Sequence, residues 1–341
     1  MTTNEVRAIA QTAALPISDP QSLVETTVDV PDPGPHDLLV EVSAVSVNPV
    51  DVKLRSGSEP GGGLRVLGFD ASGTVRAVGS EVTRFAPGDA VAYAGAIDRP
   101  GSNAALQLVD ERIVGRKPST LSHAEAAALP LTAITAWEAL FDKLRLDEES
   151  TGTLLVVGGA GGVGSVALQL VRALLPGVRV VATASRPESS AWAREMGAHE
   201  VVDHHGDLPA QVLALAPEGI DWVFTTNSSG QLPVYERVLR PFGQIVAIDD
   251  PAEVDVLPLK SKAITWHWEF MFARSLHRAT DIARQHEVLE AVADLVEAGT
   301  VRTTATTVLR PVSVETLREA HRLVEGGRVV GKVVVTDEPV S

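Results

Sequence analysis

Three glycines stand at a spacing that suits the binding of a pyrophosphate. Gly159, Gly161 and Gly164 follow the apolar segment 154–157, and apolar residues recur at helical spacing from Gly162 onward. A strand, a tight turn and a helix in this order direct backbone N–H groups and the positive end of a helix dipole to one place. The absence of side chains lets a pyrophosphate approach that backbone closely. The spacing therefore predicts a dinucleotide-binding turn, and a glycine-rich turn packed inside a core is the alternative.

Strand and helix patterns alternate around this turn. Strands are expected at Leu154–Val157, Val178–Thr183, Glu200–Val202, Trp222–Thr225 and Gln244–Ile248, with helices near 162–175, 187–196, 208–216 and 232–240. A sixth strand, Ala263–Trp268, would form one edge of the sheet. This alternation is typical of a doubly wound parallel sheet. We therefore expect an α/β chain in which residues 129–268 form a Rossmann-type nucleotide-binding domain.

The flanking segments predict a second, mostly β domain. Residues 1–128 contain short β-branched runs separated by Pro, Gly and Asp, which is typical of a compact antiparallel β domain. The runs are Val6–Ala10, Leu38–Val45, Gly73–Val78, Ala90–Tyr93 and Ala105–Val109. Residues 269–341 predict a long helix over 276–298, a strand over 304–309, a helix over 314–325 and a strand over 329–335. We expect these late elements to rejoin the N-terminal β domain.

Composition excludes several classes of function. The 341 residues include no cysteine, which excludes disulfides, thiolate metal ligands and cysteine nucleophiles. A formal net charge of −15 argues against nucleic acid or an anionic membrane as a partner. The uncharged segment 150–171 is broken by glycines and changes period, so we do not expect it to span a membrane. With no secretory signal at the N-terminus, a cytoplasmic location is expected.

Several motifs occur together in one order. They are Asn48–Arg55, Gly68–Val75 with Val78-Gly79 and Pro87–Asp89 behind it, and Ala127–Ala133 ahead of the glycine turn. With these motifs the chain resembles, over nearly its whole length, the medium-chain dehydrogenase/reductase superfamily in its zinc-free quinone oxidoreductase branch. Leu108–Gly115 and Trp266–Phe272 resemble the subgroup called zinc-type alcohol dehydrogenase-like. The resemblance implies a GroES-like catalytic domain joined to a Rossmann domain that binds NADPH.

The same resemblance predicts that no metal takes part. Zinc-dependent relatives place a Cys in the neighbourhood of Asn48-Pro49 and a His at the position of Phe69. Asp70 is the remaining potential ligand at this place, and a catalytic zinc takes about three protein ligands. The four-cysteine structural lobe of those relatives is missing too. We therefore expect no functional metal site.

The end of the second strand of the nucleotide domain favours NADPH over NADH. An NAD-binding fold usually places Asp or Glu there, where the carboxylate binds the ribose 2′-hydroxyl. Here the segment Ala182–Arg186 has no carboxylate, so Ser185 and Arg186 can hold a 2′-phosphate. The alternative is that both residues merely cap the next helix. Lys332 is a further candidate partner of the phosphate.

The resemblance also implies where the cofactor lies. NADPH would cross the cleft between the domains with its nicotinamide facing the β domain. By position, its further contacts are Thr132, the backbone of Gly161, Gly162 and Val163, His204 beside the adenine, the segment Thr225–Asn227 with Thr225 and Asn227 at its ends, and Ile248 with Asp249. Open α/β sheets bind ligands at the carboxyl ends of their strands, where most of these residues are expected. His204 has an alternative as part of a solvated turn with His205.

A site without a metal favours a hydride acceptor that can spread the resulting negative charge over its own conjugated system. The anion formed when a quinone accepts hydride is already delocalised and can take its proton from water, so it demands less stabilisation from the site than an alkoxide does. The resemblance implies that Asn48 orients the ribose and the substrate carbonyl, with a turn-capping role as the alternative. Tyr93 could donate a hydrogen bond to that carbonyl, or it could be ordinary packing.

The aromatic stretch Trp266–Phe272 has two interpretations. At period two, Trp266 and Trp268 share one face of an edge strand, which suits pairing of Ala263–Trp268 across a two-fold axis in a homodimer, as relatives do. The other interpretation places Phe270 and Phe272 in the substrate pocket. Both are kept as expectations.

Three functions follow. The first is an NADPH-dependent, metal-independent oxidoreductase that transfers hydride to a quinone or an α,β-unsaturated carbonyl. The second is an NADPH-binding redox sensor or crystallin-like protein with little turnover. The third is an enoyl-thioester reductase, which would be expected to carry a basic groove, and the acidic balance of the chain argues against it.

Overall fold

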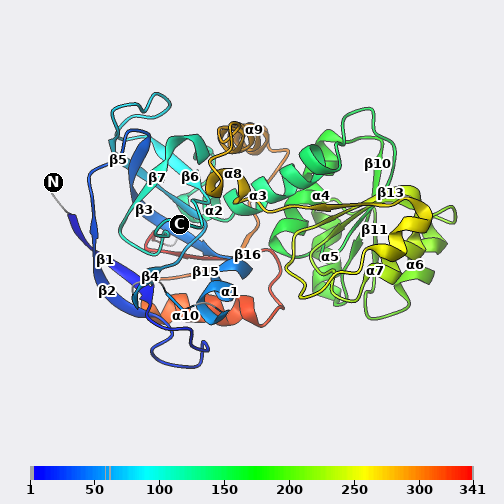
Figure 1. Ribbon diagram of the computed structural model, residues 1–341. Coiled ribbons are helices and arrows are strands. Elements are labelled where there is room, and N and C mark those ends of the chain that lie inside the picture. Colours follow the sequence, from blue (N-terminus) through cyan, green and yellow to red (C-terminus); the bar gives the residue numbers. More distant parts are fainter. Residues whose placement is uncertain (1–3, 58, 61–62, 340–341) are drawn as a thin grey trace. The chain divides into compact units, whose positions relative to one another are not determined.

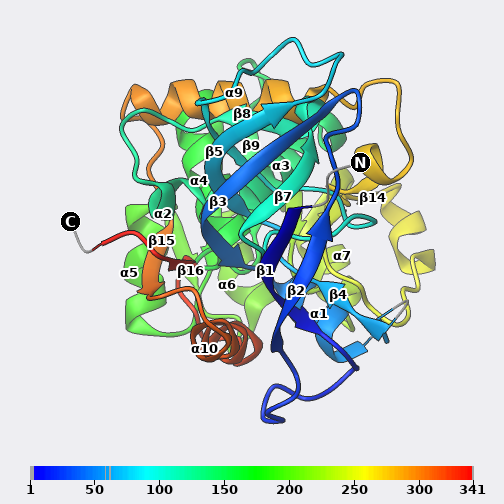
Figure 2. The same ribbon diagram turned by 90° about the vertical axis from the view of Figure 1, so that its left-hand side faces the viewer.

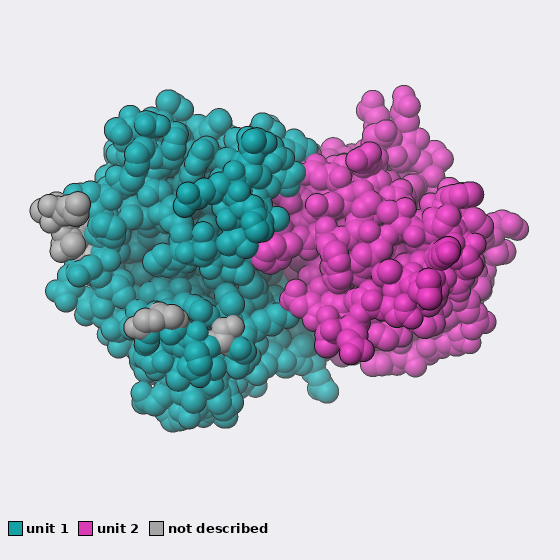
Figure 3. Space-filling view, in the orientation of Figure 1, with its two compact units in different colours: residues 1–131, 272–341 teal, residues 132–271 magenta. Residues whose placement is uncertain are grey.

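The computed structural model describes residues 4–57, 59–60 and 63–339. The chain divides into two compact units (Figure 3): unit 1 contains residues 1–131 and 272–341, and unit 2 contains residues 132–271. The limits expected from the sequence, 128 and 268, lie close to these. Unit 1 is therefore built from both ends of the chain, and unit 2 from one continuous segment.

Unit 2 is a six-stranded parallel sheet with the strand order β11-β10-β9-β12-β13-β14. The strands are β9 (Gly152–Val156), β10 (Val178–Thr183), β11 (Glu200–Val202), β12 (Ile220–Thr225), β13 (Leu239–Ala247) and β14 (Thr265–Trp268), and the helices are α4 (Gly162–Leu174), α5 (Pro187–Glu195), α6 (Leu208–Leu215) and α7 (Leu232–Val238). The expected doubly wound sheet with β14 at its edge is confirmed.

The central strands of unit 2 are buried because helices cover the sheet. All six residues of β12 are buried, which fits its nearly continuous apolar sequence. Leu155, Val223 and Ile245 are fully buried in one core cluster with Val212 of α6 and Tyr235 of α7. This packing holds the carboxyl ends of β9, β12 and β13 in fixed positions at one edge of the sheet.

Unit 1 contains a seven-stranded sheet and a smaller three-stranded one (Figures 1 and 2). The first follows the order β15-β16-β3-β5-β6-β8, with β7 also pairing with β3, and the second follows β2-β1-β4. The strands are β1 (Asn4–Gln11), β2 (Val24–Val30), β3 (Asp37–Val47), β4 (Arg65–Val66), β5 (Ala71–Val78), β6 (Ala90–Tyr93), β7 (Leu106–Asp110), β8 (Val114–Arg116), β15 (Ala305–Leu309) and β16 (Lys332–Thr336). β16 runs antiparallel to β3, so the late elements rejoin the N-terminal domain as expected.

Helices complete unit 1 and the start of unit 2. They are α1 (Pro49–Gly57), α2 (His123–Ala126), α3 (Pro130–Trp137), α8 (Ala273–Leu276), α9 (Arg284–Glu297) and α10 (Val314–Glu325). None of the helices in the described part of the chain combines the length and the apolar character that a bilayer crossing requires. The polar residues described in the next section lie at the ends of strands of unit 1 and on α1.

Some elements differ from the sequence prediction. The single helix expected over 276–298 is wrong: α8 ends at Leu276 and α9 begins at Arg284, because Arg278 adopts a left-handed conformation (φ 48°) that no helix continues through. The last strand begins at Lys332 and not at residue 329, since Gly331 precedes it with φ 65°. The strand β2 was not predicted, because its apolar residues are few and three of its seven positions are exposed.

Close packing of α9 on β8 predicts a specific cost at Gly115. A Cβ atom added there would overlap the Cβ of Leu289 on α9, and neither backbone can move aside without disturbing the sheet. Gly115→Ala should lower the free energy of unfolding in urea by about 1–3 kcal/mol. Gly57→Ala is the control, since nothing lies within 4 Å of its added Cβ. Equal losses in both variants would contradict this packing argument.

Candidate active site

Four buried polar residues form a cluster in unit 1. Asn48 follows β3, Asp51 lies on α1, Asp70 immediately precedes β5 and Lys332 begins β16. The antiparallel register that pairs Val333 with Val47 places Lys332 beside the end of β3. All four side chains belong to residues that are at most 4% exposed.

Lys332 and Asp70 form the centre of this cluster. The Lys332 ammonium donates to Asp70 Oδ2 at 3.1 Å and to Asn48 Oδ1. The Asn48 amide donates to the same Asp70 oxygen at 2.9 Å and to the carbonyl of Phe69 at 3.2 Å. The other Asp70 oxygen accepts the N–H of Leu131 at 2.8 Å. The polar atoms of these three side chains are thus engaged with one another and with the backbone.

The cluster holds two carboxyl groups and one ammonium. Asp51 accepts the N–H groups of Asn48 at 2.8 Å and Gly68 at 3.0 Å. Burial raises the pKa of Asp51 to about 7, although these two bonds and Lys332 oppose the shift. Burial likewise raises the pKa of Asp70, against the opposing effect of Lys332 and Asn48. Removing the ammonium would leave a buried carboxylate unpaired, which typically costs about 3–5 kcal/mol.

The residues of this cluster do not fit a catalytic zinc ion. The resemblance implies a Cys of zinc-dependent relatives in the neighbourhood of Asn48-Pro49 and a His at the position of Phe69, and this chain has no cysteine. The Lys332 ammonium is itself the cation beside Asp70, so a divalent ion there would meet a like charge. Among the described residues, no group of three or more His, Asp or Glu is placed to hold a metal ion. We therefore derive no chemistry through a metal.

An apolar cavity of about 610 Å³ in unit 1 includes Phe69 in its wall. Other lining residues are Leu64, Val66, Ile97, Ala104 and Leu106. Phe272 is 2% exposed and packs edge-on against Phe69, with 5.3 Å between the ring centroids. Of the two predicted pocket phenylalanines, Phe272 contacts the ring of Phe69 without lining this cavity, and Phe270, in unit 2, is 45% exposed.

Tyr93 is buried in unit 1 with an unsatisfied hydroxyl. It ends β6 and packs in an apolar cluster with Val40, Val91 and Ile113. Its hydroxyl has no hydrogen-bond partner among the described residues, and burial raises its pKa. Both alternatives considered for Tyr93 are compatible with this placement: the ring is core packing, and the hydroxyl remains a protonated donor.

The glycine turn of unit 2 has the geometry that its spacing predicts. Gly159 and Gly164 have no room for a side chain. A Cβ atom added at Gly159 would lie 2.7 Å from the Cβ of Ala182, and one added at Gly164 would overlap the carbonyl of Gly158. At Gly161, the N-cap of α4, the nearest atom is 3.4 Å away. Gly159 and Gly164 thus allow close packing, and Gly161 leaves open space above the first turn of α4, which contains Gly162 and Val163.

Hydrogen bonds join the strand ends of unit 2 around this turn. The Gly158 N–H donates to Thr183 Oγ1 at 3.0 Å, the Thr226 hydroxyl donates to the carbonyl of Val157 at 3.2 Å, and the Ile248 N–H donates to the carbonyl of Thr225 at 3.1 Å. The carboxyl ends of β10, β9, β12 and β13 are thereby tied together. This is the edge at which open α/β sheets bind ligands.

The predicted residues after β12 and β13 lie at this edge. Thr225 is buried, and its hydroxyl accepts the N–H of Asn227 at 3.0 Å and bonds to the Tyr235 hydroxyl at 2.8 Å. Asp249 accepts the N–H of Ser228 at 2.7 Å. Asn227 is exposed to solvent. Tyr235 and Ser228 were not predicted as part of this site. Their hydrogen-bond partners, Thr225 and Asp249, lie 10 and 21 residues away in the sequence, and no sequence motif links either pair.

Ser185 and Arg186 follow β10 at the same edge and are half-buried. Arg186 occupies the N-cap position of α5, as the alternative to phosphate binding requires, and its N–H donates to Ser189 Oγ at 3.2 Å. The side-chain contribution to this cap comes from Ser189. The cap thus uses the backbone N–H of Arg186, so both capping of the helix and binding of a phosphate by the guanidinium are compatible with this position.

The three remaining predicted cofactor contacts have different surroundings. Thr132 is buried on α3. His204 is exposed after β11 and its ring contacts that of His205 in a tilted arrangement, with 4.4 Å between the ring centroids; partial burial lowers its pKa. Lys332 belongs to the buried cluster with Asp70, where its ammonium is already paired.

Two family models match the chain. A model described as zinc-binding dehydrogenase matches residues 196–335, and one described as alcohol dehydrogenase GroES-like domain matches residues 34–130. They correspond to much of unit 2 with the C-terminal return, and to most of the N-terminal β domain.

Individual proteins match over most of their length. A zinc-type alcohol dehydrogenase-like protein of Staphylococcus aureus is 42% identical over 313 residues, covering 89% of this chain and 92% of that protein. A crystal structure from Rhizobium etli, named as a candidate zinc-dependent alcohol dehydrogenase, has a TM-score of 0.94 at 45% identity and covers 99% of this chain and 100% of its own. The 2-methylene-furan-3-one reductase of Solanum lycopersicum is 30% identical over 325 residues, 93% of this chain and 76% of that protein.

The fold, the glycine turn and these similarities agree with the resemblance read from the motifs. The chain belongs to the medium-chain dehydrogenase/reductase superfamily, whose members are nucleotide-dependent oxidoreductases.

Proposed function

We propose that this protein is an NADPH-dependent, metal-independent reductase that transfers hydride to a quinone or an α,β-unsaturated carbonyl. The observation that carries the proposal is the Lys332–Asp70–Asn48 cluster, in which the carboxylate of Asp70 is paired with an ammonium group of the protein itself. Support also comes from the tomato relative, whose name specifies the reduction of a furanone with a conjugated methylene group.

The acceptor class follows from what the protein can stabilise. Bound NADPH supplies the hydride. Addition of hydride to an enone or a quinone spreads the new negative charge over a conjugated system, so a hydrogen-bond donor can suffice where an alkoxide needs a stronger electrophile. The Tyr93 hydroxyl, buried without a partner, and the Asn48 amide are our candidate donors. To reach a substrate, Asn48 must give up one of its internal acceptors.

The apolar cavity beside Phe69 supports this class of substrate. Its volume of about 610 Å³ lies in the range of small-molecule sites, and aliphatic side chains such as Leu64, Val66 and Leu106 line part of its wall. We propose that the flat conjugated part of the substrate packs there, with Phe272 holding the ring of Phe69 in place.

The decisive experiment is an assay of NADPH oxidation after dialysis against EDTA. We expect turnover of quinones and enones at an undiminished rate, and little turnover of saturated aldehydes or alcohols. Tight NADPH binding with no turnover of any acceptor would instead support the redox-sensor alternative. Loss of activity on chelation, restored by zinc, would contradict the metal-independent mechanism, and a strong preference for enoyl-coenzyme A would favour the enoyl-thioester alternative.

Selectivity for NADPH is proposed to rest on Ser185 and Arg186. They follow β10 with no carboxylate between them and the strand end, and Arg186 is the N-cap of α5, where the helix dipole also favours an anion. The ammonium of Lys332 is paired with Asp70, so we leave it out of the phosphate site.

Arg186→Ala should weaken NADPH binding by about 10- to 100-fold, the range of one charge-assisted contact, and change NADH binding by less than about threefold. Equilibrium titration of nicotinamide fluorescence measures both. Arg194→Ala, at the exposed end of the same helix, is the matched control and should leave both affinities unchanged. Equal losses for the two cofactors in Arg186→Ala would remove the phosphate assignment.

We also propose a homodimer formed through β14. In the described part of unit 2, the large exposed apolar side chains all fall within residues 242–270, and β14 leaves one edge of the sheet unpaired. Trp268, 49% exposed, lies on this edge strand. Pairing with β14 of a second copy would satisfy the edge and bury these side chains.

Sedimentation velocity tests the dimer. The native protein should sediment as a dimer at micromolar concentration, and Trp268→Glu should shift it toward the monomer because a charge would be buried at the seam. Val308→Glu provides the control on β15, the edge strand of unit 1, where the side chain is 36% exposed. A monomeric native protein, or equal dissociation by both variants, would refute this interface.

A further inference from the structure

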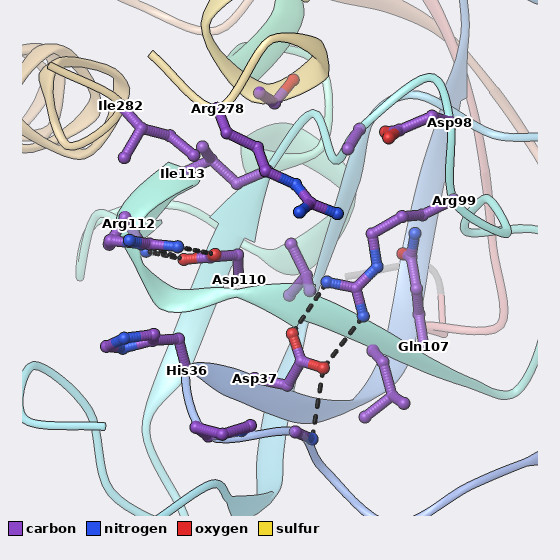
Figure 4. Close-up of a pocket in the computed structure, with 16 residues that line it drawn as sticks. His36, Asp37, Asp98, Arg99, Gln107, Asp110, Arg112, Ile113, Arg278 and Ile282 are labelled. Carbon is purple, nitrogen blue, oxygen red and sulfur yellow. Dashed lines mark hydrogen bonds and ion pairs between the residues drawn. The ribbon is translucent and has the colours of Figure 1, made fainter. Parts of the chain in front are cut away.

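A second cavity of unit 1 lies at the other end of β3 from the buried cluster. It has a volume of about 630 Å³ and is bounded by residues 34–37, the loop 96–99, the strand β7 with residues 111–113, and the turn 275–282 (Figure 4). Because β3 runs from Asp37 to Val47, its two ends lie about 30 Å apart at the usual rise per residue. This cavity is therefore separate from the Lys332 cluster.

Four of the charges around this cavity compensate one another. Arg99 donates to both carboxylate oxygens of Asp37, at 2.7 and 3.0 Å, and Arg112 donates to both oxygens of Asp110, at 2.9 and 2.6 Å. Figure 4 shows these two pairs on opposite sides of the space. These four charges neutralise one another within the cavity wall. Recognition of a charged ligand therefore depends on the charged and polar groups that are not paired.

Arg278 is one of these remaining groups. In the described part of the chain its guanidinium has no hydrogen-bond or ion-pair partner, and it points into the cavity in the direction of Arg99 (Figure 4). The backbone of Arg278 is left-handed, with φ 48°, a conformation that is unfavourable for a residue with a Cβ atom. Backbone strain of this kind persists only where the surrounding structure enforces it, and it is common at ligand-binding sites.

Two acceptors face the same space. The carboxylate of Asp98 is exposed and has no ion-pair partner among the described residues. Gln107 is 4% exposed and uses its Nε2 to donate to the carbonyl of Pro100 at 3.0 Å, which leaves its buried Oε1 without a partner. A buried acceptor without a donor costs free energy, which a ligand N–H group would recover.

We propose that this cavity binds a zwitterionic small molecule, an α-amino acid with an apolar side chain. The ligand carboxylate pairs with Arg278, and its ammonium group is taken by Asp98 and Gln107 Oε1. The balance of one unpaired cation against one unpaired anion matches a zwitterion and disfavours a simple anion, which would leave Asp98 uncompensated. Buried Ile113 and Ile282, with Val109, provide an apolar wall for the ligand side chain.

Three probes of one shape test the proposal by isothermal titration calorimetry. They are L-leucine, 4-methylpentanoate, which lacks the ammonium group, and 3-methylbutylamine, which lacks the carboxylate. We expect L-leucine to bind saturably and at least about tenfold more tightly than either partial ligand, since each lacks one charge-assisted contact. No saturable binding of L-leucine, or equal binding of 4-methylpentanoate, would overturn the assignment.

Variants locate the binding. Arg278→Gln should weaken L-leucine about tenfold or more, and Asp98→Asn should weaken L-leucine while leaving 4-methylpentanoate unchanged. Arg284→Gln is the matched control, because this arginine begins α9, pairs with Glu287 and does not line the cavity. Asp98→Asn tests the site independently if Arg278→Gln disturbs folding. Equal weakening by Arg284→Gln, or unchanged affinity in Asp98→Asn, would refute the site.

Discussion

The buried ion pair between Lys332 and Asp70 is the interaction on which unit 1 depends. It joins the start of β16 to the residue that precedes β5, and both groups are almost wholly removed from water. Burial of one partner alone would be strongly unfavourable, so the pair requires β3, β5 and β16 to be correctly paired at the same time. Asn48 bonds to both Lys332 and Asp70, and Asp51 accepts the N–H of Asn48, so the site is organised by hydrogen bonds among its own residues.

The sequence allowed unit 2 to be predicted in more detail than unit 1. Its helices and strands alternate locally, and the roles of Gly159, Gly161 and Gly164 follow from spacing along the chain. The environment of Lys332 could not be predicted, because it depends on a strand pairing across most of the chain; the residue was expected at a phosphate and is paired with Asp70. The break before α9 was missed as well, since the left-handed backbone of Arg278 has no signature in its residue type.

The two cavities of unit 1 share a wall, and neither could be read from the sequence. Asp98, Arg99, Gln107 and Leu108 line both of them. The loop that holds Asp98 and Arg99 has no regular secondary structure, and the Arg99–Asp37 ion pair fixes it to the start of β3. Movement of this loop would alter both cavities together, which provides a direct physical link between a ligand in one and the shape of the other.

The division of unit 1 between the two ends of the chain has a consequence for synthesis. Unit 2 is one continuous segment that can fold as a unit once residue 271 has left the ribosome, whereas residues 44–47 of β3 lack their partner strand until β16 has been made. During that interval the carboxyl of Asp70 lacks the Lys332 ammonium that pairs with it in the folded chain. The last strand to be synthesised thus completes the ion pair at the centre of the site, so a chain that stops early lacks the site even where its nucleotide-binding unit is already formed.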